Sequence, residues 1–346
     1  MAAREEPRIP PPTLGLALSV QHRPEDSQAA RFAEHVEQVR LARAVGFSSV
    51  WASQHYLSEP FSYFQPLPTL GRMAAEAEGM ALGTGVLLLP LHQPVDFAEQ
   101  LATLDVISGG RLIVGVGLGY RDAENEALGL NPRHRVGRFV EALQVVERLW
   151  SGEPVTHRGT HFTLNDVRIS MPPAQRPRPP VWLAANTDHG VRRAAQLGDA
   201  WLMNPHTTGA ALRRQLALFR DARRAGGRPV ARDVPLIREC CVAPTTADAL
   251  AAGGPFLDAK YGAYRSWEQD RALPDDDQWS ARFDELARDR FLLGDPARVR
   301  EEVERYREQL GITTLIVRVQ WPGMAQAAVL RSIRLLGEQV LAKLAR

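Results

Sequence analysis

Residues 80–129 constrain the fold of this chain more than any other stretch, because they hold a strand, a helix and a second strand between very short connections. Residues 80–89 are apolar and favour a strand, and Pro94 then occupies a position that the first turn of a helix tolerates. Two glycines end that helix. Residues 112–116 form a continuous apolar run, typical of a parallel strand buried on both faces. The stretch therefore predicts a βαβ unit.

Both strands of this unit contain glycines at positions where a strand would gain from a side chain. Gly85 lies inside the first run, and the second run continues through Gly115, Gly117 and Gly119 to Tyr120. Such glycines indicate either the close approach of a backbone or flat ligand, or tight packing against a neighbouring strand, and the residues alone leave both open. No GxGxxG register fits, which argues against a dinucleotide fingerprint, and the lack of a GK[ST] sequence excludes a P-loop.

A joint of helix, glycine and strand recurs at Gly46, Gly198 and Gly311, as an alternating β/α fold produces. Eight strands and eight helices are spread evenly along the chain, which favours an α/β fold of the (β/α)8 TIM barrel type over an open doubly wound sheet. The expected strands are residues 14–20, 47–51, 80–89, 112–116, 181–185, 200–202, 234–243 and 314–319. The expected helices are residues 29–44, 66–78, 94–107, 136–150, 190–197, 210–225, 296–309 and 325–344.

Two segments do not fit this repeat. Residues 154–180 resemble a β-hairpin inserted before strand 5, and the polar residues 245–290 interrupt the chain after strand 7. Long insertions in a barrel usually lie over its C-terminal face, so we interpret both as lids or dimer surface. We expect residues 1–13, which are charged and rich in proline, to be a disordered lead and not a signal peptide, and residues 14–346 to be one barrel domain.

Composition excludes several classes of function. The net charge of the 346 residues is +2 and the basic residues are scattered, which argues against a nucleic-acid partner, and no apolar run is long enough to span a membrane. Cys240 and Cys241 are adjacent in an apolar run, so they are expected to be core residues of a cytoplasmic protein. His157 and His161 have no cluster of cysteines or carboxylates beside them, so we expect no metal site.

The loop after the second predicted strand contains Gln54, His55 and Tyr56. In a barrel this loop opens on the face where active sites are built, so the histidine is a candidate for proton transfer or for binding a polar edge of a ligand. A solvated loop histidine is the alternative interpretation, and the position at the end of a strand favours a functional role.

The fifth predicted strand runs directly into a helix. Asn186, Thr187 or Asp188 can cap that helix, and its free N–H groups suit a phosphate, although ordinary capping explains the same residues. The pair Arg192-Arg193 either adds positive charge there or forms a solvent-exposed face. No GxSxG or other nucleophile motif is present. A barrel mouth rich in glycine, a helix start suited to phosphate and no nucleophile suggest that a bound cofactor performs the chemistry.

The phrase LGTGVLLLP…PVDFAEQLATLDVISGGRLIVGVGLGYRDAENEALG resembles the central block of the bacterial luciferase-like family of flavin or deazaflavin dependent oxidoreductases. GFSSVWASQHY, PVWLAANTDHGVRRAAQLGDAWL and LGDPARVREEVERYREQLGITTLIVRVQWPGM resemble three further blocks. The likeness covers roughly residues 14–344 and fails mainly at the two insertions. It implies a barrel that binds its cofactor at the C-terminal ends of the strands.

The resemblance assigns roles to single positions. His55 matches the histidine that faces the cofactor ring and handles protons, which makes it the candidate catalytic residue, and Gly85-Val86 matches a non-prolyl cis peptide that supports the ring. Gln54 and Tyr56 replace residues common in luciferases proper, which makes light emission doubtful. The cofactor-binding set that we expect is Thr84, Gly85, Val86, Gly117, Gly119, Tyr120, Ala185, Asn186, Thr187, His189 and Gly190.

Within that set Asn186 and His189 match residues that bind the cofactor phosphate. Leu118 stands where luciferases have a phosphate-binding arginine, so Arg121 is a possible replacement. The substrate side that we expect consists of Gln54, Tyr56, Asn204, His206, Arg318 and Trp321.

The resemblance implies a two-component monooxygenase that takes reduced FMN from a separate reductase and oxidises a small organic substrate with O2. Hydride transfer by the deazaflavin coenzyme F420 is the first alternative, and a flavin-binding protein without turnover is the second. Family members commonly form homodimers through their early helices. Here the helices at residues 66–78 and 94–107 contain Leu70, Met73 and Val106, which could cover a partner.

Overall fold

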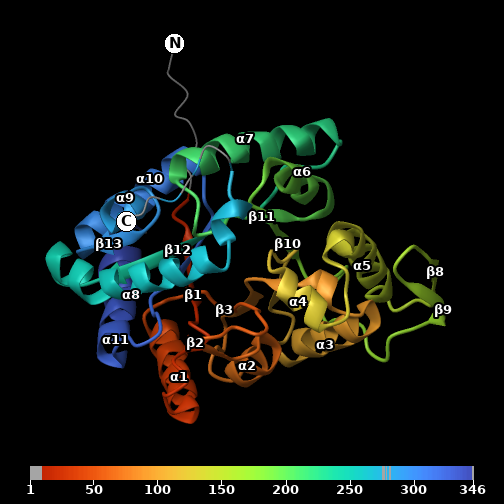
Figure 1. The fold of residues 1–346 in the computed structure, drawn as a ribbon, viewed down its shortest axis with the longest axis horizontal. Helices are drawn as coiled ribbons and strands as arrows, with labels where there is room; N and C mark the ends of the chain where they lie inside the picture. The colour runs from red at the N-terminus through yellow and green to blue at the C-terminus, as the bar shows by residue number, and fades with distance from the viewer. Residues whose placement is uncertain (1–9, 275–276, 278, 280–281, 345–346) are drawn as a thin grey trace.

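The computed structural model of the chain describes residues 10–274, 277, 279 and 282–344 (Figure 1). Most of the predicted disordered lead, residues 1–9, lies outside the described residues, and the first strand begins at Thr13. Among the described residues no helix combines the length and the apolar character that crossing a membrane requires.

One long sheet organises the molecule, and its strands are paired in parallel in the order β11-β10-β7-β5-β3-β1-β14-β12-β13. The short strand β6 (Leu87–Leu88) pairs with β7 beside this path. The strands are β1 (Thr13–Ala17), β3 (Ser49–Ala52), β5 (Ala81–Thr84), β7 (Leu112–Gly117), β10 (Val181–Ala184), β11 (Ala200–Leu202), β12 (Pro235–Val242), β13 (Leu292–Gly294) and β14 (Thr314–Arg318).

The sheet is curled. An isolated parallel bridge joins Met203, just after β11, to Leu236 in β12, and the amide of Ile237 donates to the Met203 carbonyl at 3.0 Å. Each of the eight predicted strands corresponds to a strand of this sheet, whereas β13 was not predicted. The helices lie outside the strands in Figure 1, so the carboxyl ends of the strands open on one common face.

The helices correspond to the eight predicted ones, with three additions and one shortened member. The second helix ends at Met73, short of residue 78, and α4, α8 and α9 were not predicted. The helices are α1 (Gln28–Ala44), α2 (Pro66–Met73), α3 (Pro94–Ile107), α4 (Asp122–Ala127), α5 (Arg135–Leu149), α6 (Asp188–Leu197), α7 (Gly209–Ala225), α8 (Thr246–Ser266), α9 (Phe283–Ala287), α10 (Pro296–Leu310) and α11 (Gln326–Leu335), followed by a π-helical stretch (Leu336–Leu341) and α12 (Ala342–Leu344).

The two irregular segments differ in structure. Residues 154–180 contain the predicted hairpin, an antiparallel pair of β8 (Val155–Arg158) and β9 (Thr163–Val167) that projects at the right of Figure 1. Glu141 of α5 accepts from the His157 ring at 3.0 Å and so anchors the hairpin on the outside of the molecule. Residues 245–290, predicted as a polar interruption, contain the 21-residue helix α8, which begins at a Thr245 cap. Pro255 lies inside α8, at a position where proline disfavours a helix.

The space inside the curled sheet is filled by side chains. Trp51 of β3 and Trp182 of β10 stack with ring centroids 5.2 Å apart. Gly15 and Gly83 make room for Trp51, because a Cβ on either glycine would lie within 2.7 Å of atoms of its ring. At these two positions the glycines therefore serve packing and not a ligand.

Two buried histidines, His22 and His35, lie at a two-stranded antiparallel sheet formed by β2 (Gln21–His22) and β4 (Ser62–Tyr63). The Nε2 atoms of His22 and His35 are 3.2 Å apart, and His35 Nε2 is 2.9 Å from the Ser19 carbonyl oxygen. Burial, aided by the Arg31 charge, lowers the pKa of His22 to about 4, and burial beside His22 lowers the pKa of His35 to about 3. Both rings are therefore neutral in the folded protein near neutral pH.

This pair predicts a loss of stability in mild acid. Below pH about 6.5 the unfolded chain binds protons on both histidines and the folded chain does not, so the free energy of unfolding should fall by about 1.4 kcal/mol per pH unit for each. Urea unfolding between pH 7 and pH 4 measures the slope. In a His35→Gln variant the slope of the free energy of unfolding against pH should be smaller by about 1.4 kcal/mol per pH unit, because one of the two histidines is gone. An unchanged slope in that variant would mean that other groups cause the acid sensitivity.

Candidate functional site

A cavity of about 250 Å³ opens at the carboxyl ends of the strands, where β3, β6, β7, β10, β11 and β14 end. Fourteen of the residues predicted from the sequence line it, and they come from segments far apart in the chain. They are Gln54, His55, Gly85, Val86, Gly117, Gly119, Tyr120, Ala185, Asn186, Thr187, Gly190, Asn204, His206 and Arg318.

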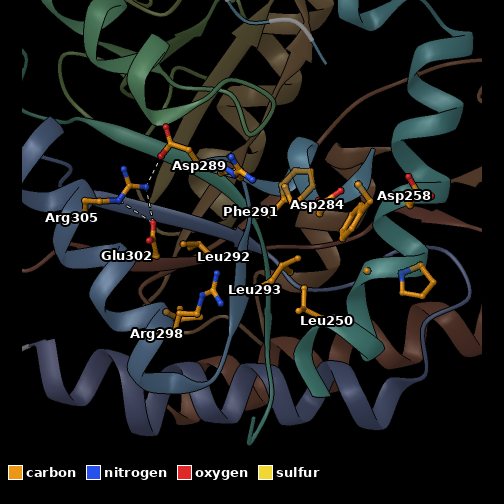
Figure 2. Close-up of a pocket in the computed structure, with 16 residues that line it drawn as sticks. Leu250, Asp258, Asp284, Asp289, Phe291, Leu292, Leu293, Arg298, Glu302 and Arg305 are labelled. Atoms are coloured by element: carbon orange, nitrogen blue, oxygen red, sulfur yellow. Dashed lines mark hydrogen bonds and ion pairs between the residues drawn. The ribbon is translucent and has the colours of Figure 1, made fainter. Parts of the chain in front are cut away.

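A larger cavity of about 860 Å³ lies between α8, α9, β13 and α10 (Figure 2). It contains none of the residues predicted for a site. Its charged side chains include Arg305, which is paired with Asp289 and Glu302 at 2.5 and 2.7 Å, as the dashed lines in Figure 2 show. Paired charges on an open face do not form a catalytic arrangement, so the smaller cavity is the candidate site.

The peptide bond between Gly85 and Val86 is cis, as predicted, and it separates β5 from β6 at the wall of the cavity. A Cβ on Gly85 would meet its nearest neighbour only at 3.6 Å, so packing does not require this glycine. A Cβ on Gly115 would lie 1.9 Å from the Thr84 carbonyl oxygen, so packing does require that one. The two explanations left open by the sequence thus apply to different glycines, and Gly85 is the one that fits a ligand at the wall.

Gln54 connects the loop after β3 to this wall. Its amide N–H donates to the Val86 carbonyl at 3.0 Å, and its side-chain oxygen accepts from the Leu88 amide at 2.9 Å. The His92 ring lies 2.9 Å from the same oxygen, and burial lowers the pKa of His92 to about 4, so a neutral ring donates there. Gln54 lines the cavity, but its acceptor is fully used in holding the loop and the wall together.

His55 is held by a carboxylate that the sequence analysis did not identify. Its Nδ1 lies 3.0 Å from Oε1 of Glu124, and the same oxygen accepts from the Tyr56 amide at 2.9 Å. Glu124 is 1% exposed and comes from α4, directly after the glycine-rich end of β7. With its Nδ1–H donating to the Glu124 carboxylate, His55 has Nε2 left to exchange a proton with a ligand.

Aromatic rings surround His55. The ring centroids of Tyr63 and Tyr120 are each 5.8 Å from that of His55, and Trp267 lies 6.4 Å away. The Arg121 guanidinium stacks on Trp267 at 4.6 Å and donates to the carbonyls of Tyr56 and Leu57 at 2.8 and 2.9 Å. Arg121 is therefore engaged with the loop, and the suggestion that it replaces the phosphate-binding arginine does not fit these contacts.

The other end of the cavity reaches the start of α6. Thr187 caps this helix, with its hydroxyl oxygen 3.2 Å from the Gly190 amide, and Asn186, Thr187 and Gly190 line the cavity. Arg193, one turn into the helix, also lines the cavity, and burial lowers its pKa. A capped helix start with an arginine one turn later is suited to an anion such as phosphate. His189 is exposed and does not line the cavity.

The remaining polar wall of the cavity is built on a buried carboxylate, Glu239 of β12. Arg318 donates to its Oε1 at 3.1 Å, Lys260 of α8 forms an ion pair with the same oxygen, and the Trp321 indole N–H donates to Oε2 at 2.7 Å. Arg318 lines the cavity. Trp321, predicted on the substrate side, lies behind this wall and does not line the cavity.

Two further predicted residues, Thr84 and Tyr56, also lie outside the lining. The Thr84 hydroxyl pairs with the amide and carbonyl of Gly115 at 2.8 Å, and the Tyr56 hydroxyl accepts from Gln54 at 3.1 Å. Sequence reasoning missed two lining residues from the irregular segment, Tyr264 and Gln269, and left the role of Arg193, which also lines the cavity, open. Gln269 is tied to the site because Tyr120 donates to its side-chain oxygen at 3.2 Å.

Comparison with known proteins identifies the family of the chain. A family model described as luciferase-like monooxygenase matches residues 13–314. An F420-dependent hydroxymycolic acid dehydrogenase from Mycobacterium tuberculosis is 30% identical over 230 residues, which are 64% of this chain and 61% of that protein. The oxygenase component of a flavin-dependent trigonelline monooxygenase from Acinetobacter baylyi is 24% identical over 246 residues, 70% of this chain and 68% of that one.

Among solved structures, the monooxygenase RslO1 from Streptomyces bottropensis matches with a TM-score of 0.85 and 27% identity, covering 96% of this chain and 99% of that chain. The chain spans about half the length of other curated relatives that it matches. Because the family model covers most of the sequence, the chain belongs to the luciferase-like monooxygenase family.

Proposed function

We propose that this chain is a flavin-dependent oxidoreductase, and that it acts as the oxygenase of a two-component monooxygenase, taking reduced FMN from a separate reductase and oxidising a small organic substrate with O2. The observation that carries the proposal is the convergence of the Gly85-Val86 wall, the His55–Glu124 pair and the start of α6 on one cavity. The oxygenase component of a flavin-dependent trigonelline monooxygenase among the relatives supports a flavin cofactor and a two-component monooxygenase.

The residues around the cavity fit such a cofactor. Gly85 and Val86 would hold the flat ring, since no side chain stands between that backbone and the cavity at Gly85. Thr187, Gly190 and Arg193 would hold the phosphate at the start of α6. When bound, the cofactor would supply the redox chemistry, which no side chain here can supply. The task left to the chain is to orient the ring, to exclude water and to exchange a proton at His55 Nε2.

Hydride transfer with coenzyme F420 is a second candidate. The relative from Mycobacterium tuberculosis is named as an F420-dependent dehydrogenase, and it aligns with this chain over 230 residues. F420 and FMN share a flat tricyclic ring and a phosphate, so the contacts proposed above would serve either. A flavin-binding protein without turnover is a third candidate, which an assay of turnover tests directly.

Titrating the purified protein with reduced FMN and with reduced F420 separates these functions. We expect one of the two to bind at micromolar concentration, and oxygen consumption in the presence of reduced FMN if the monooxygenase assignment is correct. Tight binding of F420 alone, without oxygen consumption, would move the assignment to hydride transfer. Binding of neither would contradict the proposed function.

Arg193 gives a prediction for the phosphate. Arg193→Met should weaken cofactor binding about tenfold or more, because a charge-assisted hydrogen bond to the phosphate is lost. The adjacent Arg192 is exposed and does not line the cavity, so Arg192→Met is a matched control that should leave the dissociation constant nearly unchanged. Equal effects of the two changes, measured by fluorescence titration, would show that Arg193 does not contact the cofactor.

We also propose that residues 14–346 form a single domain.

We further propose that the protein is a homodimer. Leu70 and Met73, named above as partner contacts, are fully buried in the protomer and cannot contact a second copy. Val106 and Ile107 at the end of α3 are 42% and 55% exposed and are available. Light scattering should give the mass of a dimer, and the double change Val106→Glu with Ile107→Glu should shift it toward a monomer. A monomer of the unchanged protein at micromolar concentration would refute the dimer.

A further inference from the structure

The end of the cavity away from α6 holds more positive than negative charge. Glu239 is the carboxylate of this wall, and both Lys260 and Arg318 are paired with it. Burial and the Arg318 charge lower the pKa of Lys260 to about 7, although Glu239 opposes the shift. Against the effect of burial, Glu239 raises the pKa of Arg318 above its ordinary value, so Arg318 stays charged.

Arg238, next to Glu239 in β12, is fully buried, but it lies against Tyr306 of α10 on the other face of the strand and does not line the cavity. Its guanidinium donates to the Tyr306 hydroxyl at 3.1 Å and to the Asn204 carbonyl at 3.2 Å, and both acceptors are neutral. Its Nη2 has no hydrogen-bond partner among the described residues. The wall, made of Glu239, Arg318 and Lys260, therefore carries one surplus positive charge whenever Lys260 is protonated. A buried surplus charge is unfavourable unless a ligand of opposite charge neutralises it.

The hydrogen bonds of the Asn204 side chain also indicate a ligand with an acceptor oxygen. Its side-chain oxygen accepts from the His206 amide at 2.8 Å, and from the amide and hydroxyl of Thr207 at 3.1 Å each. Three donors on one oxygen fix the orientation of the amide. The Nδ2 group has no partner among the described residues, although Asn204 lines the cavity and is only 7% exposed. A buried amide donor without an acceptor is costly, so a ligand oxygen is expected beside it.

We propose that this wall binds an anionic oxygen group of the substrate, with Arg318 and the Asn204 amide as its donors. The proposal rests on the proposed function, since it takes the start of α6 as the place of the cofactor phosphate. Arg318 remains fixed by Glu239, so its guanidinium is oriented before the substrate arrives. The substrate class is therefore a small carboxylate, or another compound that is ionised on oxygen.

The shape of the wall favours a flat molecule. His206 and Tyr264 line the cavity with ring centroids 5.7 Å apart. Burial and the Lys260 charge hold the pKa of His206 well below its ordinary value, so its ring is neutral and adds no charge to the wall. Neutral aromatic rings beside a cationic donor suit an aromatic acid, which makes benzoate an appropriate probe.

The test compares benzoate with benzamide, its neutral analogue, on protein saturated with whichever cofactor it binds. Calorimetry should show that benzoate binds about tenfold or more tightly than benzamide, because the hydrogen bond from Arg318 is charge-assisted. Arg318→Met should remove about tenfold or more of the benzoate affinity and leave benzamide nearly unchanged. Lys260 and Trp321 still pair with Glu239 in that variant, so it does not strand the carboxylate.

Asn204→Asp is a second test. It keeps the oxygen that accepts from His206 and Thr207 and replaces the free donor with an acceptor that repels an anion, so benzoate binding should weaken about tenfold while benzamide changes less. Arg193→Met is the matched control in the same cavity and should affect the cofactor and not benzoate.

Equal affinity for benzoate and benzamide in the unchanged protein would overturn the proposal, as would an Arg318→Met variant with benzoate affinity within twofold. Loss of cofactor affinity in Arg318→Met without loss of benzoate affinity would also overturn it and assign Arg318 to the cofactor. In these three cases cofactor still binds to the unchanged protein, so the proposed function stands. Failure of both FMN and F420 to bind would instead contradict the proposed function.

Discussion

His55→Ala should lower turnover by about 10²–10⁴-fold and leave cofactor affinity nearly unchanged, because general acid–base catalysis contributes an effect of that size. The structure places His55 at the cavity with Nδ1 held by Glu124 at 3.0 Å, so that Nε2 is free for the proton. The cofactor contacts proposed for Arg193 lie at the other end of the cavity and are not altered. Turnover is followed as re-oxidation of the reduced cofactor in stopped flow.

Glu124→Gln tests how His55 is held. The amide keeps the shape of the side chain but can present its N–H₂ to Nδ1, which favours the wrong tautomer, so turnover should fall about tenfold or more and the pH dependence of the rate should shift. His55→Ala with turnover within twofold would refute a proton-transfer role. Lost cofactor binding with normal turnover at saturation would assign His55 to binding the ring.

Glu239→Gln should destabilise the folded protein by about 3–5 kcal/mol, because it leaves Lys260 and Arg318 buried without a counter-charge. The opposing charges also determine the pKa values: burial raises the pKa of Glu239, but Lys260 and Arg318 outweigh it and lower the pKa to about 2. Urea unfolding at pH 7 measures the loss. Glu78→Gln, which removes a carboxylate that is 88% exposed and lies 3.6 Å from Arg43, is the control and should change stability little.

The loss in Glu239→Gln should shrink as the pH rises from about 5 to about 7 and stay level above that. The pKa of Lys260 is about 7 in the unchanged folded protein, and without Glu239 burial keeps this lysine neutral at lower pH as well. Stability rises with pH wherever the unfolded state binds more protons, so only the variant gains stability from Lys260 as the pH rises to about 7, and both proteins gain equally above it. A loss below 1 kcal/mol at pH 7 would mean that water already compensates these charges.

Local patterns in the sequence were sufficient to predict the strands of the parallel sheet. The short βαβ unit at residues 80–117 favours one handedness and makes its two strands neighbours, as β5 and β7 are in the sheet, and helix, glycine and strand follow one another again at Gly46, Gly198 and Gly311. The irregular parts were less predictable. Pro255 and its preceding glycines disfavour a helix, yet α8 forms because one face packs on the curled sheet through buried residues such as Tyr261.

Site residues at or just after the end of a strand could be predicted, because the strand end places them at the common face; His55, Asn186 and Arg318 are examples. Glu124 could not be predicted, because it lies 69 positions from His55 in the chain and only the folded structure brings the two together. Arg193 was within reach of sequence reasoning. It lies three residues after Gly190, on the same face of α6, whereas Arg192 lies on the exposed face.

The proposed function depends on the cofactor binding in the cavity at the strand ends, and a crystal structure of the protein with its bound cofactor tests this most directly. The account predicts electron density for the ring against Gly85-Val86 beside His55, with the phosphate at the start of α6 within hydrogen-bonding distance of Arg193. Density for the cofactor in the larger cavity between α8 and α10, or a phosphate far from α6, would contradict it.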